Sequence, residues 1–200
     1  MTLLRRMAAL LIAPLAAMLL ASCGINAVPT AEELAKAKWA DVQNQYQRRA
    51  DLIPNLVGTV KGYAQQERDV LVEVTNARAR ATSVNVSPDQ LTDPQAMAQF
   101  QQAQGALSQS LGRLLLVVER YPDLKSNQNF LALQSQLEGT ENRIAIARSD
   151  YNEAVRAYNT EIRTFPSIMA ARIIYGSKPM VPYQATAPGA ERPPEVSFEK

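Results

Sequence analysis

Few residues in this 200-residue chain could do chemistry. It holds one cysteine, Cys23, and no histidine. Histidine is the usual general base near neutral pH and the usual partner of a catalytic serine or cysteine, so these nucleophile arrangements are excluded. A lone cysteine also excludes an internal disulfide and a cysteine-based zinc site. We expect no metal and no cofactor, and we interpret Cys23 as a point of attachment.

Carboxylates are the remaining candidates for catalysis. A glycan hydrolase uses two carboxylates roughly 5–10 Å apart across a cleft. The candidates are Glu67, Glu73, Glu119, Asp123 and Glu141. The sequence indicates long helices, however, and these offer grooves rather than loop-built clefts. We therefore expect a protein without enzymatic activity.

Residues 1–22 have the zones of a secretion signal. Arg5 and Arg6 precede an apolar run from Met7 to Leu20. Its length fits the ~7–15 residues of a signal peptide and falls short of the ~20 needed to span a bilayer. Leu20-Ala-Ser-Cys23 resembles the bacterial lipobox, in which the chain is cleaved before a cysteine that carries diacylglycerol. We expect acylated Cys23 to anchor the mature chain; an uncleaved short anchor is the alternative.

The predicted signal segment also determines the expected side of the membrane and the net charge of the mature chain. The domain would face the periplasm, and Gly24 after the cysteine resembles outer-membrane sorting, which is slightly favoured over the inner membrane. Without Arg5 and Arg6, the 21 basic residues fall to 19 and equal the 19 acidic ones. A neutral chain has no electrostatic footprint for nucleic acid.

Apolar residues recur in steps of three and four after a tether at 23–29, which is typical of bundled helices. The first helix is predicted over 30–81, continuous but kinked at Pro54 because proline loses a backbone hydrogen bond. Its seam is Trp39, Val42, Tyr46, Arg49, Ile53, Leu56, Val60, Tyr63, Glu67, Val70, Val74, Ala77 and Ala81.

Two further long helices follow a polar loop at 82–93. Asp93-Pro94 supplies an N-cap and a proline at the first helical position, and that helix ends at Tyr121-Pro122. Its seam is Met97, Phe100, Gln104, Leu107, Leu111, Leu114, Val118 and Tyr121. The next helix runs from about 128 to Phe165-Pro166, and its seam is Phe130, Leu133, Leu137, Thr140, Ile144, Ala147, Tyr151, Ala154 and Tyr158. A short apolar helix, 168–175, would end at Gly176. We expect it to pack against the bundle; the alternative is that it dips into a membrane surface, which it is too short to span. The proline-rich residues 177–200 read as an extended tail.

These elements predict an all-α fold: an elongated antiparallel bundle of three long helices, with a short fourth helix and an extended C-terminal tail. The bundle would occupy residues 30–176. The second helix is about half as long as the first, so the turn at Tyr121–Lys125 should lie level with Pro54. Residues 30–52 would then project as a stalk that exposes Trp39, Val42 and Tyr46, unless a second subunit, the tail or helix 168–175 covers them.

Several segments resemble the LemA family. The matching words are "WADV" at 39–42, "QRRADLIPNLVGTVKGYAQQE" at 47–67, "VTNARA" at 74–79, the long run at 119–159 that begins "ERYPDLKSNQNF", "FPS" at 165–167 and "PPEVSF" at 193–198. The resemblance implies a helical bundle on a membrane anchor, with no established enzymatic chemistry and one branch linked to magnetosome membranes. This chain departs from the family in using a lipid where members commonly use an uncleaved transmembrane helix.

A polar cluster is predicted around the kink and the second turn. Its residues are Arg48, Arg49, Asp51, Pro54, Asn55, Glu67, Tyr121, Pro122, Asp123 and Lys125. It could recognise an acidic group on a partner, or repair the kink and pair internally. Arg49 and Glu67 would be costly if buried alone, and Glu67 is expected to meet Arg113 or Arg143. Tyr151-Asn152 and Tyr158-Asn159 share one helix stripe, where their rings would pack in the core or form a polar ladder for docking.

The function we predict is that of an envelope lipoprotein acting as a non-catalytic scaffold or adaptor through protein–protein contacts. Its partners would be the membrane, through the lipid, and an unidentified envelope protein. Two alternatives remain open: a glycan-binding or glycan-cleaving protein of the cell wall, and a membrane-shaping homo-oligomer assembled along the exposed seam of 30–52.

Overall fold

The computed structural model describes residues 25–184, which fold mainly into helices and contain no strand. The all-α prediction is confirmed for this part of the chain. Cys23, the signal segment and the tail beyond residue 184 lie outside the described residues. The described residues divide into two compact units, the first containing residues 25–42 with Ala147–Pro182, and the second containing Gln43–Ile146 with residues 183–184. We describe each unit by itself.

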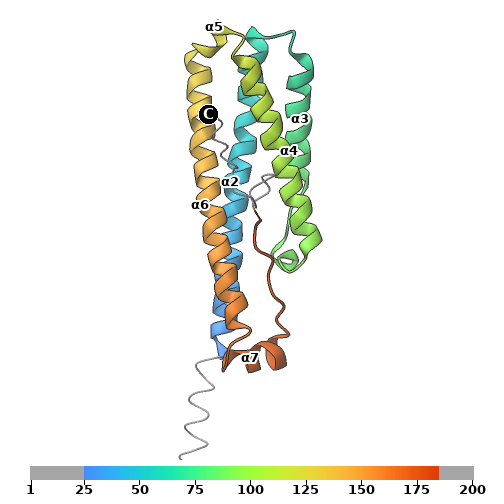
Figure 1. The fold of residues 1–200 in the computed structure, drawn as a ribbon, viewed down its shortest axis with the longest axis vertical. Helices are drawn as coiled ribbons and strands as arrows, with labels where there is room; N and C mark the ends of the chain where they lie inside the picture. Colours follow the sequence, from blue (N-terminus) through green and yellow to red (C-terminus); the bar gives the residue numbers. More distant parts are fainter. Residues whose placement is uncertain (1–24, 185–200) are drawn as a thin grey trace, which may run out of the picture. The chain divides into compact units, whose positions relative to one another are not determined.

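Four long helices carry the fold (Figure 1). They are α2 (Ala27–Tyr63), α3 (Arg68–Ser83), α4 (Pro94–Val118) and α6 (Gln128–Glu161). The short elements are η1 (Pro88–Gln90), α5 (Pro122–Lys125), α7 (Ser167–Ala170) and the π-helical turn η2 (Ala171–Tyr175). Helices α2 and α6 contribute to both units. None of the described helices is long and apolar enough to cross a membrane.

The helix boundaries follow local chemistry where the sequence signals are strong. Asp93 caps α4 by accepting a hydrogen bond from the Gln95 backbone N–H at 2.8 Å, with Pro94 at the first helical position. Gly176 follows η2 with a φ of 58°, in the left-handed region that favours glycine. Both signals were read from the sequence.

In the second unit, the predicted helix over 30–81 proves to be two helices. Helix α2 passes through Pro54 without ending, as expected, but it stops at Tyr63, and α3 begins at Arg68. The Arg78 Nε donates to the Ala50 carbonyl at 2.8 Å, so α3 runs antiparallel to α2. The prediction of three long helices was therefore wrong. The reversal lets Leu71, Val74 and Ala77 join the core cluster of Ile53, Leu56 and Val60.

Helix α4 returns antiparallel along α3. Near one end of α3 the Gln104 Nε2 donates to the Ala81 carbonyl, and farther along α3 Arg113 pairs with Glu73 at 2.9 Å. The α4 residues predicted to face the core are buried from Met97 to Val118. The three-and-four spacing therefore identified the buried face correctly.

The second turn does not lie beside Pro54. The Tyr121 hydroxyl donates to Glu67 at 2.9 Å, and Asn127 Nδ2 donates to the Tyr63 hydroxyl at 2.8 Å. The segment 121–127 thus meets the α2–α3 turn, about ten residues beyond Pro54 along the chain. The predicted level was wrong because it assumed that the first helix continued past Tyr63.

In the first unit, the start of α2 packs antiparallel against the end of α6. Lys38 Nζ pairs with Asp150 at 3.1 Å, and the Trp39 and Tyr151 rings lie 5.1 Å apart. The Tyr151 hydroxyl donates to the Val181 carbonyl at 2.9 Å, so the chain after Gly176 packs along α6. This part of the predicted tail is ordered against the bundle.

The predicted exposed stalk is buried. Trp39 and Val42 are fully buried in the first unit, and Tyr46 is 5% exposed in the second. The Tyr151 ring packs on Trp39, while Phe100 and Tyr183 pack on Tyr46. The tail was one of the three covers considered for these residues. The surface that the sequence predicted for partner binding is therefore part of the core.

Candidate functional site

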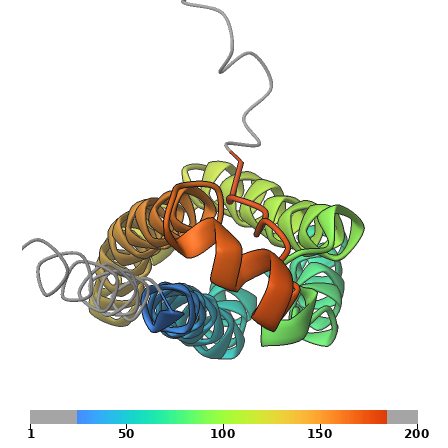
Figure 2. The same cartoon turned by 90° about the horizontal axis from the view of Figure 1, so that it is seen from below.

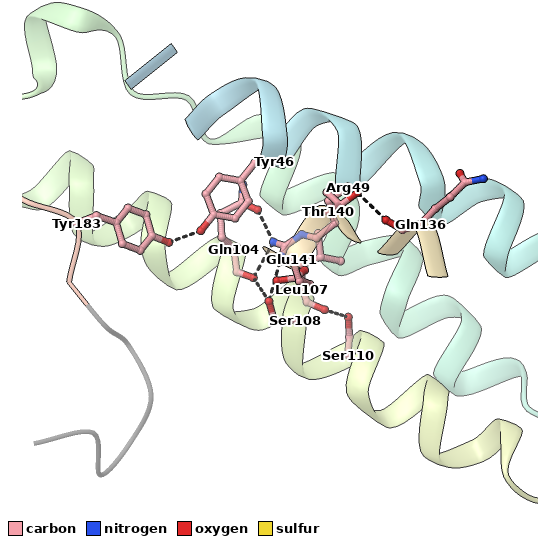
Figure 3. Close-up of polar contacts among 10 residues, drawn as sticks. All are labelled: Tyr46, Arg49, Gln104, Leu107, Ser108, Ser110, Gln136, Thr140, Glu141 and Tyr183. Atoms are coloured by element: carbon pink, nitrogen blue, oxygen red, sulfur yellow. Dashed lines mark hydrogen bonds and ion pairs between the residues drawn. The ribbon is translucent and has the colours of Figure 1, made fainter. Parts of the chain in front are cut away.

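A buried arginine ties three helices together in the second unit (Figure 3). Arg49 occupies the apolar seam of α2 and is 1% exposed. Its Nη1 donates to Ser108 Oγ of α4 at 2.8 Å and to Glu141 Oε1 of α6 at 2.9 Å. Its Nη2 donates to the Gln104 side chain at 2.8 Å and more weakly to the Gln104 carbonyl at 3.3 Å.

The charge of Arg49 is balanced mainly from one side. The side chain of Glu141 is half exposed, so its carboxylate connects the buried guanidinium with solvent. The guanidinium carbon lies 4.9 Å from the centre of the Tyr46 ring, within the range of a cation–π contact. Arg49 Nε is buried with no hydrogen-bond partner among the described residues. Arg49 of α2 is thereby linked to both α4 and α6.

The exposed side of Glu141 opens on a groove between α4 and α6. The groove has a volume of about 520 Å³. Leu111, Leu115 and Leu137 provide its apolar lining, and its polar lining is Ser108, Gln134, Glu138, Glu141 and Asn142. Ser108 and Glu141 belong to both the groove and the Arg49 cluster. The arginine therefore holds two of the polar residues that line this groove.

The other predicted polar residues do not form one cluster with Arg49. Arg48, Asp51, Pro54 and Asn55 are exposed on α2, and Asp51 accepts a hydrogen bond from Gln47 of the same helix at 2.7 Å.

A second group lies at the turn between α2 and α3. Glu67 accepts hydrogen bonds from Arg120 and Tyr121 at 3.0 and 2.9 Å. The expected pairing of Glu67 with Arg113 or Arg143 was wrong, and Arg113 instead pairs with Glu73. Lys125 pairs with Glu119, and Pro122 and Asp123 are exposed. The ten predicted residues thus separate into three groups, because the break after Tyr63 separates Pro54 from the second turn.

The arrangement offers ion pairing more than acid–base chemistry. Four of the five candidate carboxylates, Glu67, Glu73, Glu119 and Glu141, are each held by an arginine or lysine. The described residues contain no group of three metal-ligating side chains. Burial raises the pKa of Tyr151 and of Tyr158, whose hydroxyls donate to backbone carbonyls of the tail. The pKa of Lys38 is raised by its hydrogen bond to Asp150.

The sequence did not identify Gln104, Ser108 and Tyr183 as candidate site residues. Gln104 interrupts an apolar seam, so its position was a visible signal that a buried polar partner faces it. Ser108 and Tyr183 carried no such signal, since only the packing of α4 and of the tail brings them to the cluster.

Comparison with known proteins points to one family. Residues 38–198 match the LemA family. The chain is 28% identical to magnetosome protein MamQ 1 of Paramagnetospirillum magneticum over 157 residues, covering 70% of this chain and 58% of the relative. It is 27% identical to MamQ of Magnetospirillum gryphiswaldense over the same length and share, and 24% identical to protein LemA of Metamycoplasma hominis over 124 residues, or 62% of this chain and 52% of that protein. The chain thus spans about half to three fifths of the length of these relatives.

Proposed function

The chain belongs to the LemA family, and from this premise we propose that it is a lipid-anchored scaffold or adaptor of the bacterial envelope that acts through protein–protein contacts. The observation that carries the proposal is the groove between α4 and α6, whose lining includes Glu141, the partner of Arg49. A groove lined by both leucines and polar side chains suits an amphipathic helix, whose apolar face covers the leucines while its polar face meets the polar side chains.

The proposed anchor is acylated Cys23, with the domain on the periplasmic side and the outer membrane slightly favoured. Leu20-Ala-Ser-Cys23 supports the lipid, and Gly24 supports the outer membrane. Helix α2 begins at Ala27, so very little chain separates the lipid from the folded domain. A domain held so close to its anchor is suited to recruit a partner to the membrane surface.

The two alternatives receive less support. A glycan hydrolase needs two carboxylates that act together, whereas Glu67, Glu73 and Glu119 are held in separate ion pairs. An oligomer formed along 30–52 needs an exposed seam, whereas Trp39 and Val42 are buried within their own unit. The adaptor proposal needs neither feature.

Site-specific photo-crosslinking in intact cells tests the groove. Leu115 lines the groove, while its neighbour Leu116 on the same helix is outside the lining and 72% exposed. We expect a photo-reactive residue at 115 to capture one discrete partner band, and the same residue at 116 to capture it weakly or not at all. Leu115→Glu should abolish co-purification of that partner, with Leu116→Glu as the matched control. Equal capture from both positions would refute the groove as the binding site of the partner.

Cys23→Ala tests the anchor. We expect this variant to lose incorporation of labelled palmitate and to accumulate as uncleaved precursor, because lipoprotein maturation acts on the thiol. Membrane fractionation of the wild type would show whether the mature chain is in the outer membrane. Normal maturation of Cys23→Ala would refute the lipid anchor and leave the groove proposal standing.

A further inference from the structure

Five large apolar side chains are exposed within one short stretch of the first unit. Phe165 is 83% exposed, Ile173 73%, Ile174 60%, Met169 54% and Tyr175 42%. This is the reverse of an ordinary amphipathic helix, since the small residues Ser167, Ala170 and Ala171 face the bundle while the large ones face outward. Exposed apolar side chains gathered in this way mark an interaction surface more often than a solvated one.

This surface lies at the same end of the first unit as the start of α2. Figures 1 and 2 both place α7 beside the first residues of α2. The Tyr158 hydroxyl, which donates to the Lys178 carbonyl just after η2, also experiences the charges of Glu32 and Lys36 from the second and third turns of α2. Ile25, which precedes α2, is 37% exposed at this end.

The chain length then sets the distance to the proposed anchor. Three residues lie between Cys23 and Ala27. The four residue-to-residue steps span at most about 3.5 Å each in an extended chain, or roughly 14 Å. If Cys23 is acylated, the start of α2 and the apolar surface beside it lie within that reach of the bilayer. This step rests on the proposed lipid anchor.

The charged residues around this surface favour contact with an anionic bilayer. Arg163, Arg172 and Lys178 are exposed, and none of them forms an ion pair with another described residue. Between residues 161 and 178 the single acid is Glu161. Apolar side chains bordered by unpaired basic residues are the pattern of segments that lie in a membrane interface, where the basic groups meet anionic headgroups.

We propose that residues 165–175 are a second membrane contact, which inserts Phe165, Met169, Ile173 and Ile174 into the surface of an anionic bilayer and fixes the orientation of the first unit on it. A single lipid-modified residue leaves a domain free to rotate about its tether. A second, protein-borne contact a short distance away removes much of that freedom. A scaffold would gain a defined orientation towards its partners.

Depth-dependent fluorescence quenching tests the proposal on the full chain. The protein is purified from membranes and reconstituted into vesicles of phosphatidylethanolamine with a minor share of phosphatidylglycerol, with brominated acyl chains as quenchers. The chain has one tryptophan, Trp39, which is fully buried and sets the baseline. Phe165→Trp and Ile174→Trp place a reporter in the proposed contact.

The matched control is Glu153→Trp. Its side chain is 76% exposed on α6 of the same unit, and it lies eight residues before the end of that helix, or about 12 Å at 1.5 Å per residue. We expect the reporters at 165 and 174 to be quenched about twofold or more beyond the reporter at 153, because bromines in the acyl chains act at short range. Equal quenching at all three positions would overturn the proposal.

The same samples separate this proposal from the anchor. Mass spectrometry of the N-terminus reports acylation of Cys23. An acylated chain whose reporter at 165 is no more quenched than the control would refute the docking and keep the anchor. A non-acylated chain with a quenched reporter at 165 would refute the lipid anchor and keep the membrane contact of residues 165–175. Disulfide-linked dimers through Ile174→Cys, together with an unquenched reporter at 165, would assign the surface to a second copy of the chain and overturn the membrane contact.

Discussion

Glu141→Gln should destabilise the second unit, because it leaves the buried charge of Arg49 without its counter-ion. The two charges are joined by a contact of 2.9 Å between a guanidinium that is 1% exposed and a carboxylate that is half exposed. Two unit charges about 4 Å apart interact by roughly 4 kcal/mol at an effective dielectric constant of about 20. Solvent at Glu141 screens this interaction, so we take about half of it.

Glutamine keeps part of the remaining interaction. It can still accept a hydrogen bond from Arg49, worth about 1 kcal/mol, and Ser108 and Gln104 continue to accept from the same guanidinium. The expected loss is therefore about 1–2 kcal/mol. For a domain of this size each kcal/mol shifts the melting temperature by about 2–4 °C, which gives a decrease of roughly 2–8 °C.

Urea unfolding followed by circular dichroism measures the loss. Glu138→Gln is the matched control, because Glu138 lies on the same helix and lines the same groove but accepts only from Gln134 of its own helix. We expect the control to change the free energy of unfolding by less than about 0.5 kcal/mol. If Glu141→Gln is as stable as Glu138→Gln, the Arg49 charge is satisfied by neutral acceptors alone, and our account of the cluster fails.

Three further predictions concern the tail, pH and the glycines. Asn159 Nδ2 donates to the Met180 carbonyl, and the Met180 N–H donates to Asn159 Oδ1, both at 2.8 Å. Asn159→Leu should therefore raise the hydrogen-exchange rate of the Met180 amide about tenfold or more. The exchange rate of the Ser177 amide, which is bonded to the Ala171 carbonyl, should be unchanged. Burial raises the pKa of Tyr151 above its ordinary value of 10.0, so its contribution to stability is complete below that pH and is lost as the pH rises, because the unfolded chain ionises first. Between about pH 9 and about pH 11 the wild type should lose up to roughly 1.4 kcal/mol per pH unit more than Tyr151→Phe; parallel pH curves for the two proteins would contradict this. A Cβ at Gly105 or at Gly176 would meet nothing within 4 Å, so alanine should act through the backbone alone. Gly105→Ala inside α4 should stabilise by about 0.5–1 kcal/mol and Gly176→Ala, at a φ of 58°, should destabilise by about 1–2 kcal/mol; thermal melts that shift in the same direction would refute that reasoning.

The sequence predicted the buried faces of the helices well. In α2, every predicted seam residue from Trp39 to Val60 is buried, and so are most of those predicted in α4 and α6. Spacing succeeds here because 3.6 residues per turn is a local property, and a helix must bury its apolar stripe whatever it packs against. Of the two interpretations of Tyr151 and Tyr158, the one that packs their rings in the core is confirmed.

The candidate site was only partly predictable. Arg49 was singled out as a charge in an apolar seam, and its burial confirms that reading. The prediction that Arg49 forms one cluster with Pro54 and the second turn was wrong, because it depended on where distant helices end. The prediction that Trp39 is exposed was wrong for a related reason. Its neighbour Tyr151 comes from the distant helix α6, and Tyr151 in turn bonds to Val181, beyond Gly176.

The sequence by itself determined the helical class, the apolar stripes, the cap at Asp93 and the stop at Gly176, since each depends on neighbouring residues. The tertiary structure decided the reversal after Tyr63, the partners of Arg49 and the outward face of residues 165–175. The apolar spacing continues from Val60 across the reversal to Val74, so one long helix and a hairpin have nearly the same local pattern. What separates them is the burial of Leu71, Val74 and Ala77 against α2 and α4, a gain that exists only once distant segments meet.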